Sequence, residues 1–220
     1  MGGFFGAVSN HDVIAEVFFG TDYHSHLGTS RGGMAAYDEK IGLQREIHNI
    51  QNSPFRTKFE HVFDEMSGNA AIGCISDTDP QPLLIRSNLG TYAISTIGKI
   101  NNANELIEHY LSFSGGHFDA MTGGRINANE LVAAMINQKS TFVEGIQFAQ
   151  RMISGTASIL ILTDEGKIIA ARDKLGRIPV IIGKNDDGYC VSFESYACFK
   201  LGYEYEKELG PGEVVEISAT

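Results

Sequence analysis

Thiol side chains are the first candidates for chemistry in this chain, and there are three of them: Cys74, Cys190 and Cys198. A thiolate can attack a carbonyl carbon or bind a metal ion. Cys74 lies inside the apolar run 70–75 (AAIGCI). A small apolar filler in a buried strand is the simpler interpretation of a cysteine in such a run, and a nucleophile is the alternative. The spacing of the three cysteines matches no metal-binding pattern.

Two other sets of polar residues stand close together. His24 and His26 could share a face and bind a metal ion, but two ligands with no carboxylate or thiolate partner are usually surface histidines. We therefore predict no metal site. Asp173 and Arg177 lie in a polar bend, where a structural ion pair or a turn is the expected role.

Composition narrows the function classes. The net charge of −10 over 220 residues argues against a nucleic-acid partner, because phosphate binding needs clustered Lys and Arg. No apolar stretch approaches the length of a membrane span, so no membrane partner is expected. Few cysteines, odd in number, favour a reduced, cytoplasmic setting over a disulfide framework.

The elements that must position these residues are centred on residues 155–193. Strands are predicted at 156–162, 167–171, 178–183 and 189–193, separated by turns that contain Glu-Gly and Asp-Gly. Consecutive antiparallel pairing is the expected result. Two of these strands are apolar on both faces, which indicates a sheet that is covered on both sides.

The rest of the chain adds strands and helices without an obvious linker. Strands are predicted at 2–8, 70–75 and 90–95, and helices between Asn10 and Gly20, at 58–66, and from capping residues at Asn102, Asn127 and Thr141. The glycine-rich stretch 24–36 is expected to be a loop that passes into a strand, and it lacks the Lys-Ser/Thr ending of a phosphate loop. The prediction is a single α+β domain over 1–220, a four-layer αββα sandwich of two antiparallel sheets.

One long stretch resembles a known family. The run 155–179 (GTASILILTDEGKIIAARDKLGRIP), then Phe193-Glu194-Ser195 and 209–213 (LGPGE), resembles the type 2 glutamine amidotransferase (glutaminase) domain of amidophosphoribosyltransferase in the same order. The resemblance implies the N-terminal-nucleophile hydrolase fold.

The resemblance also implies where catalytic residues should stand, and this sequence departs from the family there. Gly2 stands where the family has its nucleophilic cysteine, and Ser76 stands where an arginine grips the glutamine carboxylate. The run Thr96-Ile97-Gly98 stands where the family has the His-Asn-Gly that stabilises the oxyanion, and Ala128 replaces an aspartate that binds the substrate amino group. The predicted vestigial pocket consists of Gly2, Cys74, Ser76, Thr96, Ile97, Gly98 and Ala128. We expect no catalytic residue, no metal and no cofactor in this domain.

The resulting hypothesis is the N-terminal glutaminase-like domain of an amidophosphoribosyltransferase-related protein that is itself unable to hydrolyse glutamine. In that family a phosphoribosyltransferase domain follows and makes phosphoribosylamine from phosphoribosyl pyrophosphate in purine biosynthesis. That domain is the expected partner, with a homo-oligomer as a further one. Two alternatives stay open: a stand-alone binding or regulatory module on the same fold, and a hydrolase that uses another nucleophile such as Cys74.

Overall fold

Two antiparallel sheets form the centre of the computed structural model, which describes residues 2–219. The first contains seven strands: β1 (Gly2–Ser9), β2 (Arg31–Asp38), β3 (Gly42–Asn49), β4 (Ala70–Ser76), β11 (Ile181–Lys184), β12 (Gly188–Ser192) and β13 (Glu204–Glu208). The second contains five: β5 (Leu83–Ser87), β6 (Gly90–Ile100), β9 (Gly155–Thr163), β10 (Ile168–Ala171) and β14 (Val214–Ile217). Their spatial orders are β13-β11-β12-β1-β4-β2-β3 and β14-β10-β9-β6-β5.

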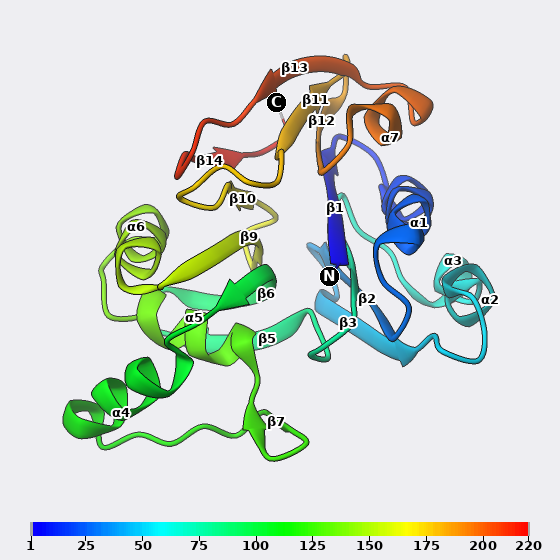
Figure 1. Ribbon diagram of the computed structural model, residues 1–220. Coiled ribbons are helices and arrows are strands. Elements are labelled where there is room, and N and C mark those ends of the chain that lie inside the picture. Colours follow the sequence, from blue (N-terminus) through cyan, green and yellow to red (C-terminus); the bar gives the residue numbers. More distant parts are fainter. Residues whose placement is uncertain (1, 220) are drawn as a thin grey trace.

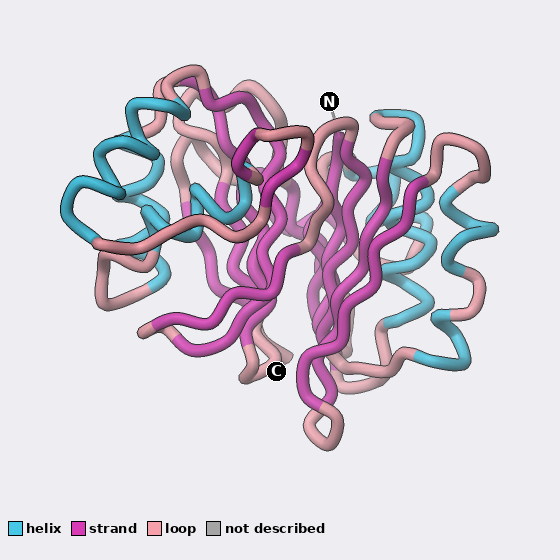
Figure 2. Tube along the Cα trace, turned by 90° about the horizontal axis from the view of Figure 1, so that it is seen from below, coloured by secondary structure: helices cyan, strands magenta, loops and turns pink. Residues whose placement is uncertain are grey.

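Helices cover the outer face of each sheet (Figures 1 and 2). On the first sheet lie α1 (Ile14–Tyr23), the short 3-10 helix η1 (His24–Leu27), α2 (Phe55–Phe59), α3 (Val62–Glu65) and α7 (Ser195–Lys200). On the second lie α4 (Ala103–Ser114), α5 (Ala128–Ile136) and α6 (Phe142–Met152). A small hairpin of β7 (Met121–Thr122) and β8 (Arg125–Ile126) projects from one end (Figure 1). The predicted four-layer αββα sandwich is confirmed.

Strand β1 shows why the sheets stack. Phe4 and Val8 point into the apolar layer between the two sheets, whereas Phe5 and Ala7 point toward the helices. Side chains alternate with a period of two along a strand, so a strand that is apolar at every position is buried on both faces. This alternation makes β1 a central strand, paired with β12 on one side and β4 on the other.

The four predicted central strands are present, but they do not all pair in sequence. Strand β9 pairs with β10 in the second sheet, and β11 pairs with β12 in the first. The chain crosses from one sheet to the other between β10 and β11. The prediction of consecutive antiparallel pairing is therefore wrong at this junction.

The bend that makes this crossing is held by two buried or half-buried charged side chains. The Asp173 carboxylate accepts hydrogen bonds from the backbone N–H groups of Leu175 and Arg177, both at 3.0 Å. The Arg172 guanidinium donates to the carbonyls of Ile178 and Gly176, at 3.0 and 2.7 Å. The bend is thus a turn fixed by side-chain contacts to backbone, because buried polar groups must find partners.

The first predicted helix begins and ends later than expected. It begins at Ile14, whose N–H donates to the Asp12 carboxylate at 3.0 Å, so Asp12 rather than Asn10 satisfies the helix start. It also continues past Gly20. A Cβ at Gly20 would lie 2.4 Å from the Phe5 ring, so the glycine serves close packing of α1 on β1 and does not end the helix.

Of the other four helix predictions, two differ from the structure and two agree with it. The predicted helix 58–66 is two short helices, α2 and α3. Asn127 and Thr141 cap α5 and α6 through their side chains, as predicted. Asn102 does not cap α4; its side-chain amide instead bridges to the backbone of Met152 and Ser154.

Of the helices described between residues 2 and 219, none combines the length and the apolar character that crossing a bilayer requires.

Candidate functional site

The predicted pocket residues gather where the start of β1 meets the second sheet. Gly2, the first residue of β1, pairs with Ser76, the last residue of β4. Across the gap between the sheets, the Ile97 Cδ1 atom on β6 lies 3.1 Å from the position that a Gly2 Cβ would occupy. Residues 96–98 are consecutive on β6. The structure therefore brings Gly2, Ser76 and Ile97 together from three strands.

Gly2 has no room for a side chain in this arrangement. A Cβ atom built there would lie 2.2 Å from the Ile75 carbonyl oxygen, which belongs to the backbone of β4. Ordinary contacts between carbon and oxygen atoms are about 3.3–3.6 Å. The space where a nucleophilic side chain would begin is filled by main-chain atoms.

The segment between β4 and β5 crosses the same region. Its buried Gln81 accepts a hydrogen bond from the Thr96 N–H at its side-chain oxygen, at 2.8 Å, and one from the Cys74 thiol at its carbonyl, at 3.3 Å. Gly33 lies so close that a Cβ there would be 1.9 Å from the Gln81 carbonyl oxygen. Gln81 thus occupies the space between Cys74 and Thr96 with a carboxamide that belongs to the chain itself.

The same segment reaches the start of α5. The Ala128 N–H donates to the Asp79 carboxylate at 3.2 Å, and the Asn127 side-chain amide donates to the Pro80 carbonyl at 2.9 Å. The segment therefore links Ala128, through Asp79, with Thr96, through Gln81. Asp79 occupies the helix N-terminus, where a carboxylate is favoured by the helix dipole.

Several polar side-chain atoms lie close to segment 77–82, on β6, on α5 and at the end of β4. Thr96 Oγ1 and Asn129 Oδ1 are buried and have no hydrogen-bond partner among the described residues. The Ser76 hydroxyl accepts from the Thr78 N–H at 3.2 Å and so turns toward its own loop. Gly98 lies against β9, where a Cβ would be 2.1 Å from the Thr156 carbonyl oxygen, so this glycine is required for close strand packing.

Cys74 has the environment of an apolar core residue. Its side chain is buried in the layer between the sheets. Burial raises the pKa of the Cys74 thiol to about 12, because a thiolate there would be desolvated. A thiol with such a pKa is almost entirely protonated at neutral pH and is a poor nucleophile. The geometry gives no support to a hydrolase built on Cys74.

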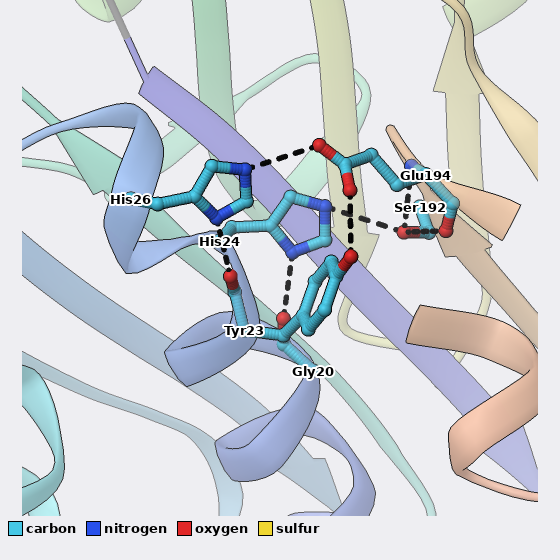
Figure 3. A network of polar contacts seen from close by, with 6 residues as sticks. All are labelled: Gly20, Tyr23, His24, His26, Ser192 and Glu194. Atoms are coloured by element: carbon cyan, nitrogen blue, oxygen red, sulfur yellow. Dashed lines mark hydrogen bonds and ion pairs between the residues drawn. The ribbon is translucent and has the colours of Figure 1, made fainter. Parts of the chain in front are cut away.

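The two histidines considered as metal ligands have different partners (Figure 3). His24 is buried, with Nδ1 2.6 Å from the Gly20 carbonyl and Nε2 3.3 Å from the Ser192 hydroxyl, and burial lowers its pKa. His26 is exposed, and its Nε2 lies 3.1 Å from a Glu194 carboxylate oxygen. The other Glu194 oxygen accepts from the Tyr23 hydroxyl at 2.8 Å. The two rings do not converge on one point, and this network joins η1 to the turn after β12.

A different histidine cluster was missed in the sequence. Glu46 and His48 on β3 and His61 between α2 and α3 bring one carboxylate oxygen and two ring nitrogens within 4.8 Å of one another. The available signal was the Glu-x-His spacing, since residues two apart on a strand share a face. The contribution of His61 could not be seen, because a loop and a helix separate it from β3 in sequence.

Comparisons with known proteins agree with this fold. A family model described as a glutamine amidotransferase domain matches residues 67–198, more than half of the chain. The amidophosphoribosyltransferase of Methanocaldococcus jannaschii is 28% identical over 99% of this chain and 47% of its own length. That of Bacillus subtilis is 27% identical over 98% of this chain and 46% of its own length.

A solved structure gives the same result. The glutamine phosphoribosylpyrophosphate amidotransferase of B. subtilis, in complex with ADP and GMP, superposes with a TM-score of 0.83 at 26% identity. The match covers 99% of this chain and 48% of that one. This chain spans about half the length of the curated relatives it matches. It belongs to the glutamine amidotransferase domain family and is homologous to the N-terminal glutaminase domain of amidophosphoribosyltransferases.

Proposed function

We propose that this chain is a glutaminase-like domain without glutaminase activity, belonging to an amidophosphoribosyltransferase-related protein. The observation that carries the proposal is the start of β1. Gly2 offers no attacking atom, and the Ile75 carbonyl oxygen lies 2.2 Å from where its Cβ would be. Cleaving a carboxamide through a covalent intermediate needs a nucleophile at the point of attack.

The other predicted positions also lack the required chemistry. The Ile97 side chain cannot donate a hydrogen bond to a developing oxyanion, and removal of one such donor typically costs about 10²–10³ in rate. The Ser76 hydroxyl and the Ala128 methyl group carry no charge to hold the carboxylate and amino group of free glutamine. Losses of nucleophile, oxyanion donor and substrate clamps together would leave no measurable hydrolysis.

The folded segment 77–82 supports a structural role in place of catalysis. Through Asp79, Pro80 and Gln81 it ties β4, β6 and the start of α5 together. In the proposed protein, this domain would pack against a phosphoribosyltransferase domain that forms phosphoribosylamine with ammonia, or with nitrogen from another subunit. A cytoplasmic setting, a homo-oligomer and the absence of a cofactor in this domain belong to the same proposal.

Two measurements test the proposal. The chain is incubated with excess L-glutamine, and glutamate release is compared with a heat-inactivated blank; we expect no difference. The protein that contains the chain and a phosphoribosyltransferase domain is then assayed for phosphoribosylamine formation with glutamine and with ammonium. We expect activity with ammonium alone. Glutamate release clearly above the blank, or equal activity with glutamine, would refute the loss of glutaminase function.

One observation favours ligand binding as a second candidate function. A cavity of about 470 Å³ opens beside β5, α5 and the segment that joins α4 to β7, and its lining includes Arg86, His117 and Glu130. Its volume is within the range of small-molecule sites. None of the seven predicted pocket residues lines this cavity, so binding there would be independent of the lost glutaminase. Thermal-shift screening of small anions, with Arg86→Ala as the control variant, would test this candidate.

A further inference from the structure

Glu46, His48 and His61 form a half-buried cluster at the edge of the first sheet. Glu46 and His48 lie two residues apart on the edge strand β3, so both point to the side of the sheet that the helices cover. His61 reaches the same point from the junction between α2 and α3. Three residues from two separate segments therefore converge.

The convergence is on a single atom. The Nε2 atoms of His48 and His61 both lie 2.5 Å from Glu46 Oε1. Ordinary hydrogen bonds from a ring N–H to an oxygen are about 2.7–3.2 Å long. Ligand atoms about 2.0–2.1 Å from a tetrahedral zinc ion are about 3.3 Å apart. To take such an ion between the three atoms, each of the two nitrogen–oxygen distances would lengthen by about 0.8 Å.

The surroundings suit a cation. No Lys or Arg forms an ion pair with Glu46 in the part of the chain that the structure describes. The His48 and Phe59 rings pack in a T-shaped contact, with their centroids 4.9 Å apart. This contact limits rotation of the His48 ring.

We propose that Glu46, His48 and His61 bind a divalent transition-metal ion of the zinc class, with water in the remaining position. Two imidazoles and one carboxylate are a ligand set typical of such ions. The ion would fasten the α2–α3 junction to the edge strand β3. This proposal departs from the sequence-based prediction of no metal site, which considered only His24 and His26.

The site is distinct from the glutaminase-like pocket. His48 pairs with Gly32, and a Cβ at Gly32 would contact Phe55 and Phe59 on the helix side of the sheet. Gly2, in contrast, faces Ile97 in the space between the sheets. The proposed metal site and the glutaminase-like pocket therefore lie on opposite faces of the first sheet, and each can be altered without the other.

The proposal is tested on the metal-free chain with Zn²⁺ alone and with Co²⁺ alone. Calorimetric titration with Zn²⁺ should give one site per chain, and Co²⁺ should produce visible absorption bands of a low-coordinate complex. A hundredfold excess of Zn²⁺ over its Kd should raise the Tm by about 5–10 °C. His48→Ala and His61→Ala should each weaken Zn²⁺ binding by about 100-fold or more, since loss of even an outer partner of a ligand costs 10–100-fold.

His11→Ala is the matched control. His11 Nε2 lies 2.9 Å from Glu16, which is a histidine–carboxylate pair without a second histidine. This variant should keep the full affinity and Tm shift. Two results would overturn the proposal: a wild-type chain with no Zn²⁺ site of Kd below about 100 µM, or unchanged Zn²⁺ binding in both His48→Ala and His61→Ala. In either case the three side chains are joined by hydrogen bonds alone and bind no metal ion. The Co²⁺ spectrum of the wild-type chain decides the question even if a variant fails to fold.

Discussion

Restoring the missing thiol at Gly2 should destabilise the protein and should not restore glutamine hydrolysis. A Cβ at this position would lie 2.2 Å from the Ile75 carbonyl oxygen and 3.1 Å from Ile97 Cδ1. To reach an ordinary carbon–oxygen contact near 3.3 Å, the strands must separate by about 1 Å. Because one obstacle is backbone within a central pair of strands, rotation of a side chain cannot relieve it.

The energy follows from this overlap. Inserting extra atoms into a packed region typically costs about 1–3 kcal/mol. For a chain of 220 residues, 1 kcal/mol corresponds to a Tm change of about 2–4 °C, so Gly2→Cys should lower the Tm by about 2–12 °C. Glutamate release should stay at the blank value, because Ile97 still offers no oxyanion donor and Gln81 still covers Thr96.

Calorimetry and an enzymatic glutamate assay on purified Gly2→Cys measure both outcomes. Gly3→Cys is the matched control on the same strand, because its Cβ would meet the ends of two side chains, Leu27 at 2.8 Å and His24 at 3.0 Å. The Leu27 end can move, so the Tm loss should be smaller than for Gly2→Cys. A Gly2→Cys chain that is as stable as the wild type, or that hydrolyses glutamine, would refute the reasoning.

Three further predictions concern buried polar groups. The Cys74 thiol, whose pKa is raised by burial to about 12, should resist iodoacetamide in the folded chain and react after unfolding; equal rates in both states would contradict its burial. Burial lowers the pKa of His24, so the unfolded state binds its proton more tightly. This contribution to stability should be constant above pH 6.5 and decline as the pH falls below it. The free energy of unfolding, measured by urea denaturation, should therefore fall between pH 7.5 and 5.5, and His24→Gln should make this fall smaller. A slope unchanged in the variant would exclude His24 as its source. Arg172→Ala should lower the free energy of unfolding by at least about 3 kcal/mol, because it leaves three backbone carbonyls without their guanidinium donor. Urea denaturation would measure it, and a loss below about 1 kcal/mol would show that water replaces the guanidinium.

Much of the fold was predictable because local patterns carry it. Apolar residues at every position of 4–8 and 159–162 require burial on both faces, and Thr141 caps the helix that follows it. These signals depend on residues near one another in sequence. Asn102 failed as a capping prediction for the opposite reason, since its amide is engaged by the backbone of Met152 and Ser154, some fifty residues away.

For the candidate site, the sequence indicated positions that lie close together, but it did not indicate what fills the space between them. The resemblance named Gly2, Ser76, Ile97 and the others, and the structure brings their strands together. That Gln81 would place its own carboxamide on the Thr96 N–H could not be inferred, because the path of segment 77–82 depends on contacts with β6 and α5.

The sequence by itself determined the family, the alternation that buries both sheets, and the absence of an attacking side chain at Gly2. These are properties of residue type and order. Tertiary structure alone decided that the Ile75 carbonyl fills the space beside Gly2, that the chain changes sheets after β10, and that His61 meets Glu46 and His48. Each of these depends on distances between segments far apart in the chain, which close packing fixes and local sequence does not encode.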